Sequence, residues 1–179
     1  MVSCDMYNLG CSGGNLYLAW AYLEHTGIVT DACMPYTSAE GDVAECPDKT
    51  CTGSGTYKKY FCKANTVIEC SGPDQIKEEL FKNGPMETGF MVYSDFMNYK
   101  SGIYQYKDGI IQGGHAVKII GFGHDDTSGL DYWICANSWG PDWGESGFFR
   151  IAWGECNIDY SVLACIPDVQ ESAADFLQF

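Results

Sequence analysis

Apolar side chains in the first half of the chain recur with the spacing of amphipathic helices. Between positions 16 and 23 they return every three or four residues, which predicts a helix over about residues 15–25. Gly27 is well placed to end this helix, because glycine adopts the left-handed conformation common at helix C-termini. A second helix is predicted to begin at residues 71–74 (Ser-Gly-Pro-Asp), where proline suits the first turn, and to end at residues 83–85 (Asn-Gly-Pro).

The second half of the chain changes to the pattern of strands. Short runs rich in β-branched and aromatic residues predict strands at about residues 87–93, 116–121, 132–136, 148–153 and 162–166. Between the two helices, residues 31–56 hold many Gly, Pro, Ser, Thr and Asp residues and predict a long irregular loop. We therefore expect an α+β fold with a helical part (1–68), a strand-rich part (69–167) and a C-terminal tail (168–179).

The composition is that of a folded, acidic protein. Of the 179 residues, 46% are hydrophobic, which supplies enough apolar side chains for a core and argues against a disordered chain. The formal net charge of -14 disfavours binding to nucleic acids and to anionic membrane surfaces, because both attract basic patches. No apolar run is long enough to cross a membrane. We expect neither nucleic acid nor membrane as a partner.

Ten cysteines are many for this length and indicate either disulfides or a metal site. Zinc sites use closely spaced Cys and His pairs, but the closest cysteines, Cys46 and Cys51, are separated by four residues, and the chain has three histidines. Disulfides are therefore favoured over zinc, and we expect no metal and no other cofactor. Because disulfides form in oxidising compartments, we expect a lysosomal or vacuolar location, or secretion.

Three short segments are candidates for chemistry. A glycine pair precedes His115 at the start of an apolar run (Gly-Gly-His-Ala-Val, residues 113–117), and Asn137 begins the sequence Asn-Ser-Trp-Gly (137–140). Near the N-terminus, residues 10–14 read Gly-Cys-Ser-Gly-Gly. Each segment alone is a weak signal, since a single histidine is more often structural than catalytic and Trp-Gly pairs often pack a turn.

Taken in order along the chain, these segments resemble the papain-like cysteine peptidases. Residues 82–85 (Lys-Asn-Gly-Pro), 92–96 (Val-Tyr-Ser-Asp-Phe) and 99–104 (Tyr-Lys-Ser-Gly-Ile-Tyr) resemble the cathepsin B-like branch of that family. The resemblance runs from about Met1 to Pro167. It implies a two-lobed fold with a helical left lobe and an antiparallel, β-barrel-like right lobe. The implied activity is that of a cysteine endopeptidase acting on peptide or protein substrates.

The resemblance assigns catalytic roles to His115 and Asn137. A thiol peptidase uses a thiolate as nucleophile, a histidine as general base and acid, and a third group that orients the imidazole ring. His115 would be the base, and the amide oxygen of Asn137 would accept a hydrogen bond from its ring. Trp139, which the resemblance also assigns to the substrate cleft, would exclude water from that hydrogen bond.

Further positions are implied to bind substrate. The backbones of Gly13 and Gly14 would pair with an extended peptide, and Gly114 and Ala116 would border the substrate beside His115.

Two departures from the cathepsin B pattern bear on specificity. The loop between Cys33 and Cys51 contains no histidine, whereas cathepsin B holds a substrate carboxylate there with paired histidines. We therefore expect no carboxydipeptidase activity. Ser161 aligns with an acidic residue at the floor of the second subsite of cathepsin B. An uncharged floor predicts a preference for apolar over arginine side chains.

The nucleophile signature of the family is absent from this chain. It reads Cys-Gly-[Ser/Ala]-Cys-[Trp/Tyr] and lies roughly 130–150 residues before the histidine, which is roughly 15–35 residues before Met1. The resemblance assigns Cys11 to a disulfide with a cysteine just upstream of the nucleophile, and the oxyanion-hole glutamine is absent too. We expect the chain to be inactive alone. It is either part of a peptidase completed by another segment or a non-catalytic relative with a structural or partner-binding role.

The absent segment also includes the central helix of the family. Its loss would expose several large apolar side chains at about 1.5–3 kcal/mol each, against a domain stability of about 5–15 kcal/mol. We expect that this chain does not fold stably alone and that a polypeptide segment supplies the helix and the nucleophile.

The resemblance implies the disulfides Cys4–Cys46 and Cys33–Cys51, each stabilising the fold by roughly 2–4 kcal/mol. It implies no pairing for five other cysteines, namely Cys62, Cys70, Cys135, Cys156 and Cys165. Two of these, Cys135 and Cys165, lie in apolar strands, where we expect buried thiols.

Overall fold

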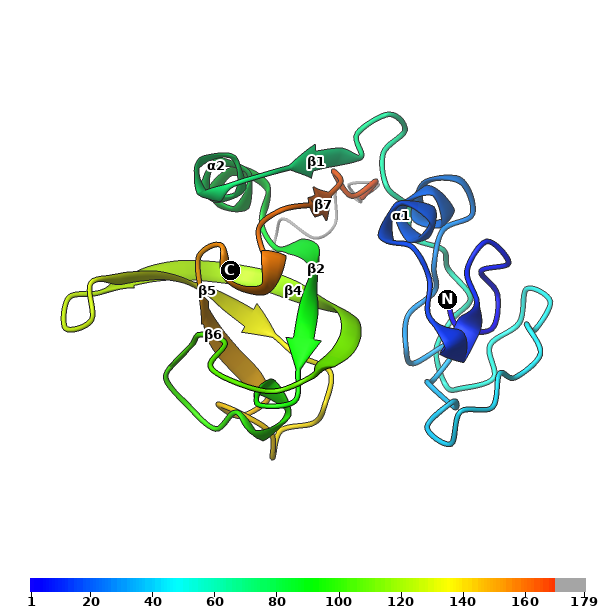
Figure 1. Cartoon of the computed structure of the whole chain (residues 1–179). Coiled ribbons are helices and arrows are strands. Elements are labelled where there is room, and N and C mark those ends of the chain that lie inside the picture. The colour runs from blue at the N-terminus through cyan, green and yellow to red at the C-terminus, as the bar shows by residue number, and fades with distance from the viewer. Residues whose placement is uncertain (170–179) are drawn as a thin grey trace. The chain divides into compact units, whose positions relative to one another are not determined.

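The computed structural model describes residues 1–169 and divides the chain into two compact units (Figure 1). The first unit comprises Met1–Val67 together with the segment that begins at Cys165, and the second comprises Ile68–Ala164. Most of the predicted C-terminal tail, residues 170–179, lies outside the described residues.

The first unit contains one α-helix and long irregular loops. A 3₁₀ turn at Gly10–Ser12 precedes helix α1, Leu16–His25, where the sequence predicts a helix. The Asn15 side chain caps α1 by accepting a hydrogen bond from the Leu18 backbone. Gly27, at φ +73°, donates its backbone N–H to the Tyr22 carbonyl and ends the helix as expected.

Disulfides hold the irregular loop of the first unit. The structure contains Cys4–Cys46 and Cys33–Cys51, the two pairs that the resemblance implies. It also contains Cys62–Cys165, so the expectation of a buried thiol at Cys165 is wrong.

This third disulfide returns the end of the chain to the first unit. The Lys63 backbone donates to the Ile166 carbonyl at 2.8 Å, and the Asp168 backbone donates to the Phe61 carbonyl at 2.8 Å. Residues 165–167, which the sequence pattern groups with the strands, therefore belong with residues 61–63.

The second unit is built on one open sheet. Its elements are β1 (Ile68–Cys70), α2 (Pro73–Asn83), β2 (Met86–Tyr93), a 3₁₀ turn (Phe96–Asn98), β3 (Ile103–Tyr104), β4 (Ile111–Asp125), β5 (Leu130–Ala136), β6 (Phe148–Ala152), a 3₁₀ turn (Glu155–Asn157) and β7 (Val162–Ala164). Within the described residues the sheet has the order β1-β7-β2-β4-β5-β6-β3. Its neighbours are antiparallel except for the parallel pair β3 and β6. The sheet is unclosed, with β1 and β3 at its edges, so the barrel-like expectation holds only in part.

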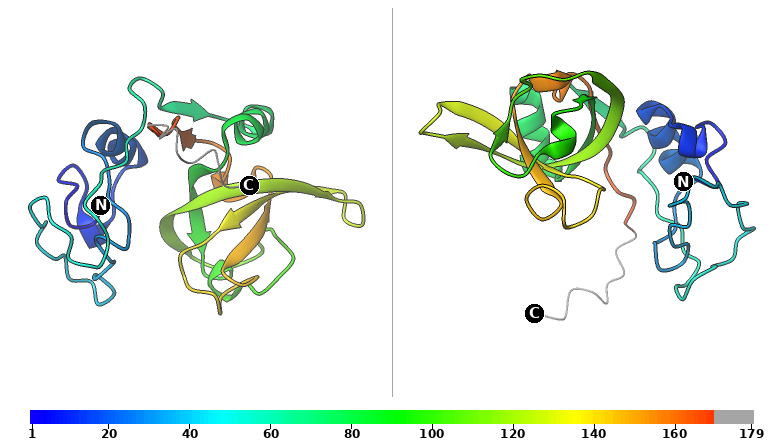
Figure 2. Two further views of the ribbon diagram at one scale, coloured as in Figure 1. Left: turned by 180° about the vertical axis from the view of Figure 1, so that it is seen from behind. Right: turned by 60° about the horizontal axis from the view of Figure 1, so that its bottom comes forward.

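Each strand predicted from the sequence is present, but the strands begin or end at residues different from those predicted. Strand β4 is much longer than the predicted 116–121, and it extends with β5 as a hairpin that projects from the sheet (Figures 1 and 2). Strand β7 stops at Ala164, because Cys165 forms its disulfide in the first unit. The two- and three-residue strands β3 and β1 are too short to leave a period in the sequence.

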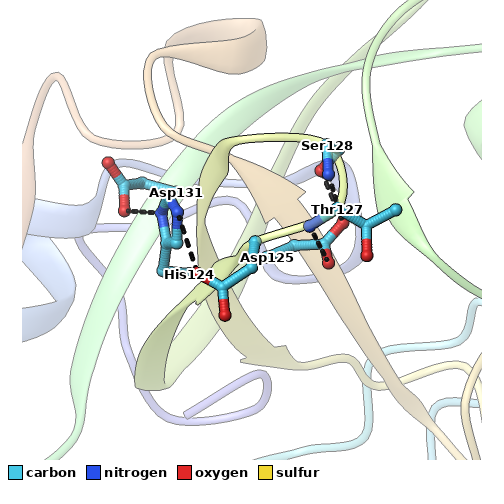
Figure 3. A network of polar contacts seen from close by, with 6 residues as sticks. His124, Asp125, Thr127, Ser128 and Asp131 are labelled. Atoms are coloured by element: carbon cyan, nitrogen blue, oxygen red, sulfur yellow. Dashed lines mark hydrogen bonds and ion pairs between the residues drawn. The ribbon is translucent and has the colours of Figure 1, made fainter.

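A polar network occupies the tip of the β4–β5 hairpin (Figure 3). The His124 ring lies between two carboxylates, with Nδ1 at 2.9 Å from Asp131 and Nε2 at 3.7 Å from Asp126. Asp125 accepts hydrogen bonds from the Thr127 and Ser128 backbones, which closes the turn.

The core of the second unit lies on one face of the sheet. Alternate residues of β2 are buried, as a strand with one covered face requires. Ile76 and Leu80 of α2 pack into the same core, because residues four positions apart lie on one face of a helix. The core continues through large, fully buried side chains, namely Trp133, Phe96 and Phe149. Strand β4 pairs with β2 along this core. Side chains of β4 that face the core are therefore fixed by packing against it.

Candidate active site

His115 lies on β4, directly opposite Phe90 of β2. Opposite residues of a ladder share a face of the sheet, so the His115 ring points toward the same side as the buried Phe90 ring. The two ring centroids are 6.0 Å apart. The imidazole also stacks on Trp139, with centroids 4.9 Å apart and planes 24° apart. The two aromatic neighbours restrict the ring to a narrow range of positions.

The His115 ring forms a hydrogen bond with Asn137, the residue that follows β5. His115 Nε2 lies 2.8 Å from Asn137 Oδ1. The Ser138 backbone N–H donates to the same Oδ1 at 2.8 Å, which identifies that atom as the amide oxygen. Because an oxygen accepts here, Nε2 carries the hydrogen. In the neutral ring, Nδ1 is then the basic nitrogen.

The loop after β5 holds Asn137 and Trp139 in place. The Asn137 backbone donates to the Gly147 carbonyl at 3.0 Å, and the Gly147 backbone donates to the Trp143 carbonyl at 2.8 Å. Trp139 packs edge-on against Trp143, with centroids 5.0 Å apart, and against the buried Phe96 at 5.7 Å. The structure therefore brings three of the predicted site residues together, and aromatic packing on the core side supports them.

Asn137 Nδ2 is buried and has no hydrogen-bond partner within the part of the chain that the structure describes. A buried amide that keeps one unmatched donor is costly, so a water or another segment is needed to pair it.

Gly114 and Ala116 flank His115 along β4 on the opposite face of the sheet. They pair with Met91 and Gly89 of β2, and a side chain at Gly114 would meet open space. This stretch of β4 therefore presents a shallow surface without large side chains.

Ser161 precedes β7 and is half-buried. Its hydroxyl donates to Glu69 Oε1 on β1 at 2.5 Å. No sequence signal pointed to Glu69, because the contact joins residues 92 positions apart.

Gly13 and Gly14 belong to the first unit, and the structure distinguishes them. Gly13, at φ +96°, has both backbone groups in the turn, since its N–H donates to Gly10 and its carbonyl accepts from Leu9. Among the described residues, Gly14 takes no part in these backbone hydrogen bonds. A side chain at Gly14 would collide with the amide of Asn8, which accepts from the Asn15 backbone at 2.7 Å. Gly14 is the better candidate for backbone pairing with a peptide.

The free thiols of the second unit are not activated. Burial raises the pKa of Cys135 far above its usual range and also raises the pKa of Cys70. Burial, with the neighbouring Glu155 carboxylate, raises the pKa of Cys156 to about 12. These three cysteines remain thiols near neutral pH, and the thiolate is the nucleophilic form. Cys11 of the first unit is an exposed free thiol.

Within residues 1–169 no group of three or more His, Cys, Asp or Glu side chains is arranged to hold a metal ion. In the same residues no helix is both long and apolar enough to cross a membrane.

Comparison with known proteins gives consistent results. The papain family of cysteine proteases matches residues 1–166. The chain is 46% identical to cathepsin B-like CP3 of Giardia intestinalis, over 91% of this chain and 55% of that protein. It is 40% identical to cathepsin B-like protease 1 of Arabidopsis thaliana, over 88% of this chain and 45% of that protein.

Among solved structures, procathepsin B S9 of Trypanosoma congolense matches with a TM-score of 0.84 and 38% identity, over 93% of this chain and 58% of that chain. The chain thus spans about half the length of the curated relatives it matches. The matched family, the cathepsin B-like relatives and the shared fold together show that this chain is a cathepsin B-like member of the papain family of cysteine proteases.

Proposed function

We propose that this chain is the larger part of a cathepsin B-like cysteine endopeptidase, and that it does not cut peptides by itself. The observation that carries the proposal is the hydrogen bond from His115 to Asn137 beneath the stacked Trp139 ring. It leaves Nδ1 of His115 as the nitrogen available to a thiol. A histidine with only a structural role would not require both the hydrogen bond to Asn137 and the stacked Trp139 ring.

In the proposed reaction, Nδ1 of His115 takes the proton of a cysteine thiol, and the thiolate attacks the carbonyl carbon of the scissile peptide bond. Nδ1–H then gives its proton to the leaving amine as the C–N bond breaks, which leaves a thioester. Nδ1 next removes a proton from water as the water oxygen attacks the thioester carbonyl carbon. The C–S bond then breaks, the carboxylic acid leaves, and Nδ1–H returns its proton to the thiolate to restore the thiol. Asn137 holds the ring in one tautomer throughout.

We propose that a polypeptide segment outside this chain supplies the nucleophile and packs on the first unit. In the described part of that unit, the buried hydrophobic residues are Tyr22, Cys33 and Cys62. The exposed apolar side chains near α1 are Met6, Tyr7, Leu9, Tyr17 and Leu18. A pocket of about 720 Å³ opens beside Tyr22, Met34 and Tyr57, and the Trp20 indole N–H is buried without a partner among the described residues. A unit with so little core of its own gains stability by packing on another segment.

The three disulfides support a lysosomal, vacuolar or secreted location, because such bonds persist in oxidising compartments. The proposed substrates are peptides or proteins. The alternative is a non-catalytic relative, and the raised thiol pKa values of the second unit are consistent with it.

The direct test is labelling of the natural protein with a thiol-directed epoxide, followed by peptide hydrolysis. We expect one labelled cysteine outside this chain and loss of hydrolysis in proportion to labelling. His115→Ala should abolish both, whereas His25→Ala, at an exposed site at the end of α1, should change neither. Absence of labelling and of hydrolysis in the natural protein would favour the non-catalytic relative.

A further inference from the structure

The loop that joins β5 to β6, residues 137–147, places Asn137 against the ring of His115. Asn137 is its first residue, and its Oδ1 accepts the hydrogen bond from His115 Nε2. Near the end of the loop, Ser146 has a φ of +58°, a left-handed backbone conformation that residues other than glycine rarely adopt. Such a conformation persists only where surrounding contacts fix it. The position of Asn137 therefore depends on what holds the far end of this loop.

The side chain of Glu145 holds that far end. Its Oε1 accepts hydrogen bonds from Arg150 Nη2 at 2.6 Å and from the Gly102 backbone at 2.9 Å, and its Oε2 accepts from Arg150 Nε at 3.0 Å. The side chains of Glu145 and Arg150 are 27% and 35% exposed, so the pair is largely shielded from water. Contact at two points fixes the direction of the carboxylate as well as its distance.

Arg150 is itself anchored in the sheet. It lies on β6, which pairs with β5 on one side and with β3 on the other. Its backbone N–H donates to the Tyr99 hydroxyl at 3.2 Å, and its guanidinium lies over the Tyr132 ring at 5.6 Å from the centroid. Glu145 thus ties the irregular loop to the sheet of the second unit.

A short backbone path leads from Glu145 to Asn137. The Asn137 backbone N–H donates to the carbonyl of Gly147, two residues after Glu145. Between them the chain turns, and the backbones of Glu145 and Phe148 exchange hydrogen bonds at 2.8 and 3.2 Å. The Glu145 side chain and the Gly147 carbonyl therefore belong to one closed turn, and a displacement of the first moves the second.

We propose that Glu145 is a positioning residue for His115. Through its bonds to Arg150 and to the Gly102 backbone, it holds the loop so that Asn137 Oδ1 stays within hydrogen-bond distance of the imidazole ring. The proposal rests on the proposed peptidase function. Glu145 acts on the reaction through Asn137 and not by contact with the substrate.

Glu145 carries its negative charge at weakly acidic and neutral pH. The hydrogen bonds from Arg150 hold the pKa of Glu145 below its usual range, against the opposing effect of partial burial, and the Gly102 N–H lowers it further. Glu145→Gln keeps the size of the side chain but removes the charge and one acceptor oxygen. It therefore weakens the contact with Arg150 with little change of shape.

The test measures peptide hydrolysis by the natural, activated protein that contains this chain. We expect Glu145→Gln to lower kcat roughly tenfold, which is less than the roughly 10²-fold cost of a misplacement of about 1 Å. KM should change little, because neither Arg150 nor Gly102 is assigned to substrate binding.

A double variant shows whether the effect passes through Asn137. In the Asn137→Ala background, Glu145→Gln should lower kcat by roughly twofold or less, because the losses are not additive when one residue acts through the other. A general loss of stability would instead lower kcat by the same factor in both backgrounds.

The matched control is Asp159→Asn, which removes the charge of another shielded carboxylate of the second unit. Asp159 is buried and accepts hydrogen bonds from the Trp133 indole and from the backbone of Gly154, which follows β6, whereas the loop precedes β6. Both Asp159→Asn and Glu145→Gln should lower the melting temperature, but Asp159→Asn should leave kcat unchanged.

Arg150→Lys is a second variant for the same contact. It keeps the positive charge but loses the two-point contact, so it should lower kcat in the same direction by a smaller factor, roughly threefold. It decides the matter if Glu145→Gln fails to fold, and an unchanged kcat in Arg150→Lys would then overturn the inference.

An unchanged kcat in Glu145→Gln, or an equal further loss in the Asn137→Ala background, overturns the inference and leaves the peptidase function standing. An equal loss of kcat in Asp159→Asn also overturns it, because the effect would then be one of general loosening. If the wild type hydrolyses neither a peptide nor an unfolded protein substrate, the proposed function fails and the inference fails with it.

Discussion

At the residue scale, the contacts of His115 decide which ring nitrogen can act as a base. The Ser138 N–H identifies Asn137 Oδ1 as the acceptor, so Nε2 of His115 carries the hydrogen. Nδ1 is then the ring nitrogen that can accept a proton. The Trp139 ring stacks on the imidazole, and we expect it to shield this hydrogen bond from water, which would strengthen it.

The first prediction concerns Asn137. If the proposed function holds, Asn137→Ala in the natural protein that contains this chain should lower kcat/KM by roughly 10²-fold, since the ring loses the group that fixes its tautomer. Steady-state peptide hydrolysis measures the change. Asn98→Ala, which removes an exposed amide bonded to the Ser94 carbonyl, is the control and should retain full activity. Equal losses in the two variants would contradict the assigned role.

The second prediction concerns the pH response of His124 at the hairpin tip. The hydrogen bond to Asp131 raises the pKa of His124, with smaller contributions from the Asp126 and Asp125 carboxylates. Because the folded pKa lies above the unfolded value of about 6.5, the stabilisation is fully present below about pH 6.5 and is lost as the pH rises through the folded pKa.

An NMR titration of the His124 ring checks this prediction. Asp131→Asn should lower its pKa, and Asp126→Asn, at the longer distance of 3.7 Å, should lower it less. A wild-type titration at or below about pH 6.5 would contradict the prediction.

At the element scale, the sequence predicts the elements that have a clear period and misses those without one. The α2 helix and strand β2 follow from their patterns, because each buries one regular face. The length of β4 does not follow, since glycines and polar residues occupy both of its ends. Short β1 and β3 depend on tertiary pairing that no local pattern records.

The candidate site likewise has residues that can be recognised in the sequence and residues that only the tertiary structure reveals. The motif residues His115, Asn137 and Trp139 are recognisable in the sequence, and the structure brings them together. The Phe90 ring beside His115 and the Glu69 carboxylate beside Ser161 come from strand register, which the sequence does not state.

The third prediction concerns the disulfide that the sequence analysis missed. Cys62–Cys165 closes a separation of 103 residues, whereas Cys33–Cys51 closes 18. The loop-entropy model assigns about 4.7 kcal/mol to a loop near 100 residues and about 3 kcal/mol to one near 15. Replacing both cysteines of Cys62–Cys165 by serine should therefore lower the free energy of unfolding more than the same change at Cys33–Cys51.

Urea unfolding of the two double variants measures the difference. A larger loss from the Cys33–Cys51 variant would show that native contacts near that loop, and not chain entropy, dominate.

At the scale of the whole molecule, the two units differ in how much core each contains. The second unit buries a continuous cluster that runs from Ile76 through Trp133 to Val162. Within the described residues, the first unit buries few apolar side chains and exposes several, among them Leu9 at 71%. A domain is stable by only about 5–15 kcal/mol, so a unit with this little core depends on additional packing.

The fourth prediction is that the first unit is stabilised by a segment outside this chain. Expressed alone, residues 1–179 should show rapid amide exchange throughout the first unit and slower exchange in β2, β4 and β5. In the natural protein, exchange in α1 should slow markedly. Hydrogen-exchange mass spectrometry measures both, and equal protection of α1 in the two samples would contradict the prediction.

The most direct test of the central claim is the intact mass and non-reduced peptide map of the natural protein. We predict that Cys11 forms a disulfide with a segment outside this chain, and that this segment carries a Cys-Gly-Ser-Cys-Trp-like sequence. That result would make the chain the larger part of a working peptidase. A natural protein that begins at Met1, with no second polypeptide and with Cys11 as a free thiol, would contradict the claim and leave a catalytically inactive relative.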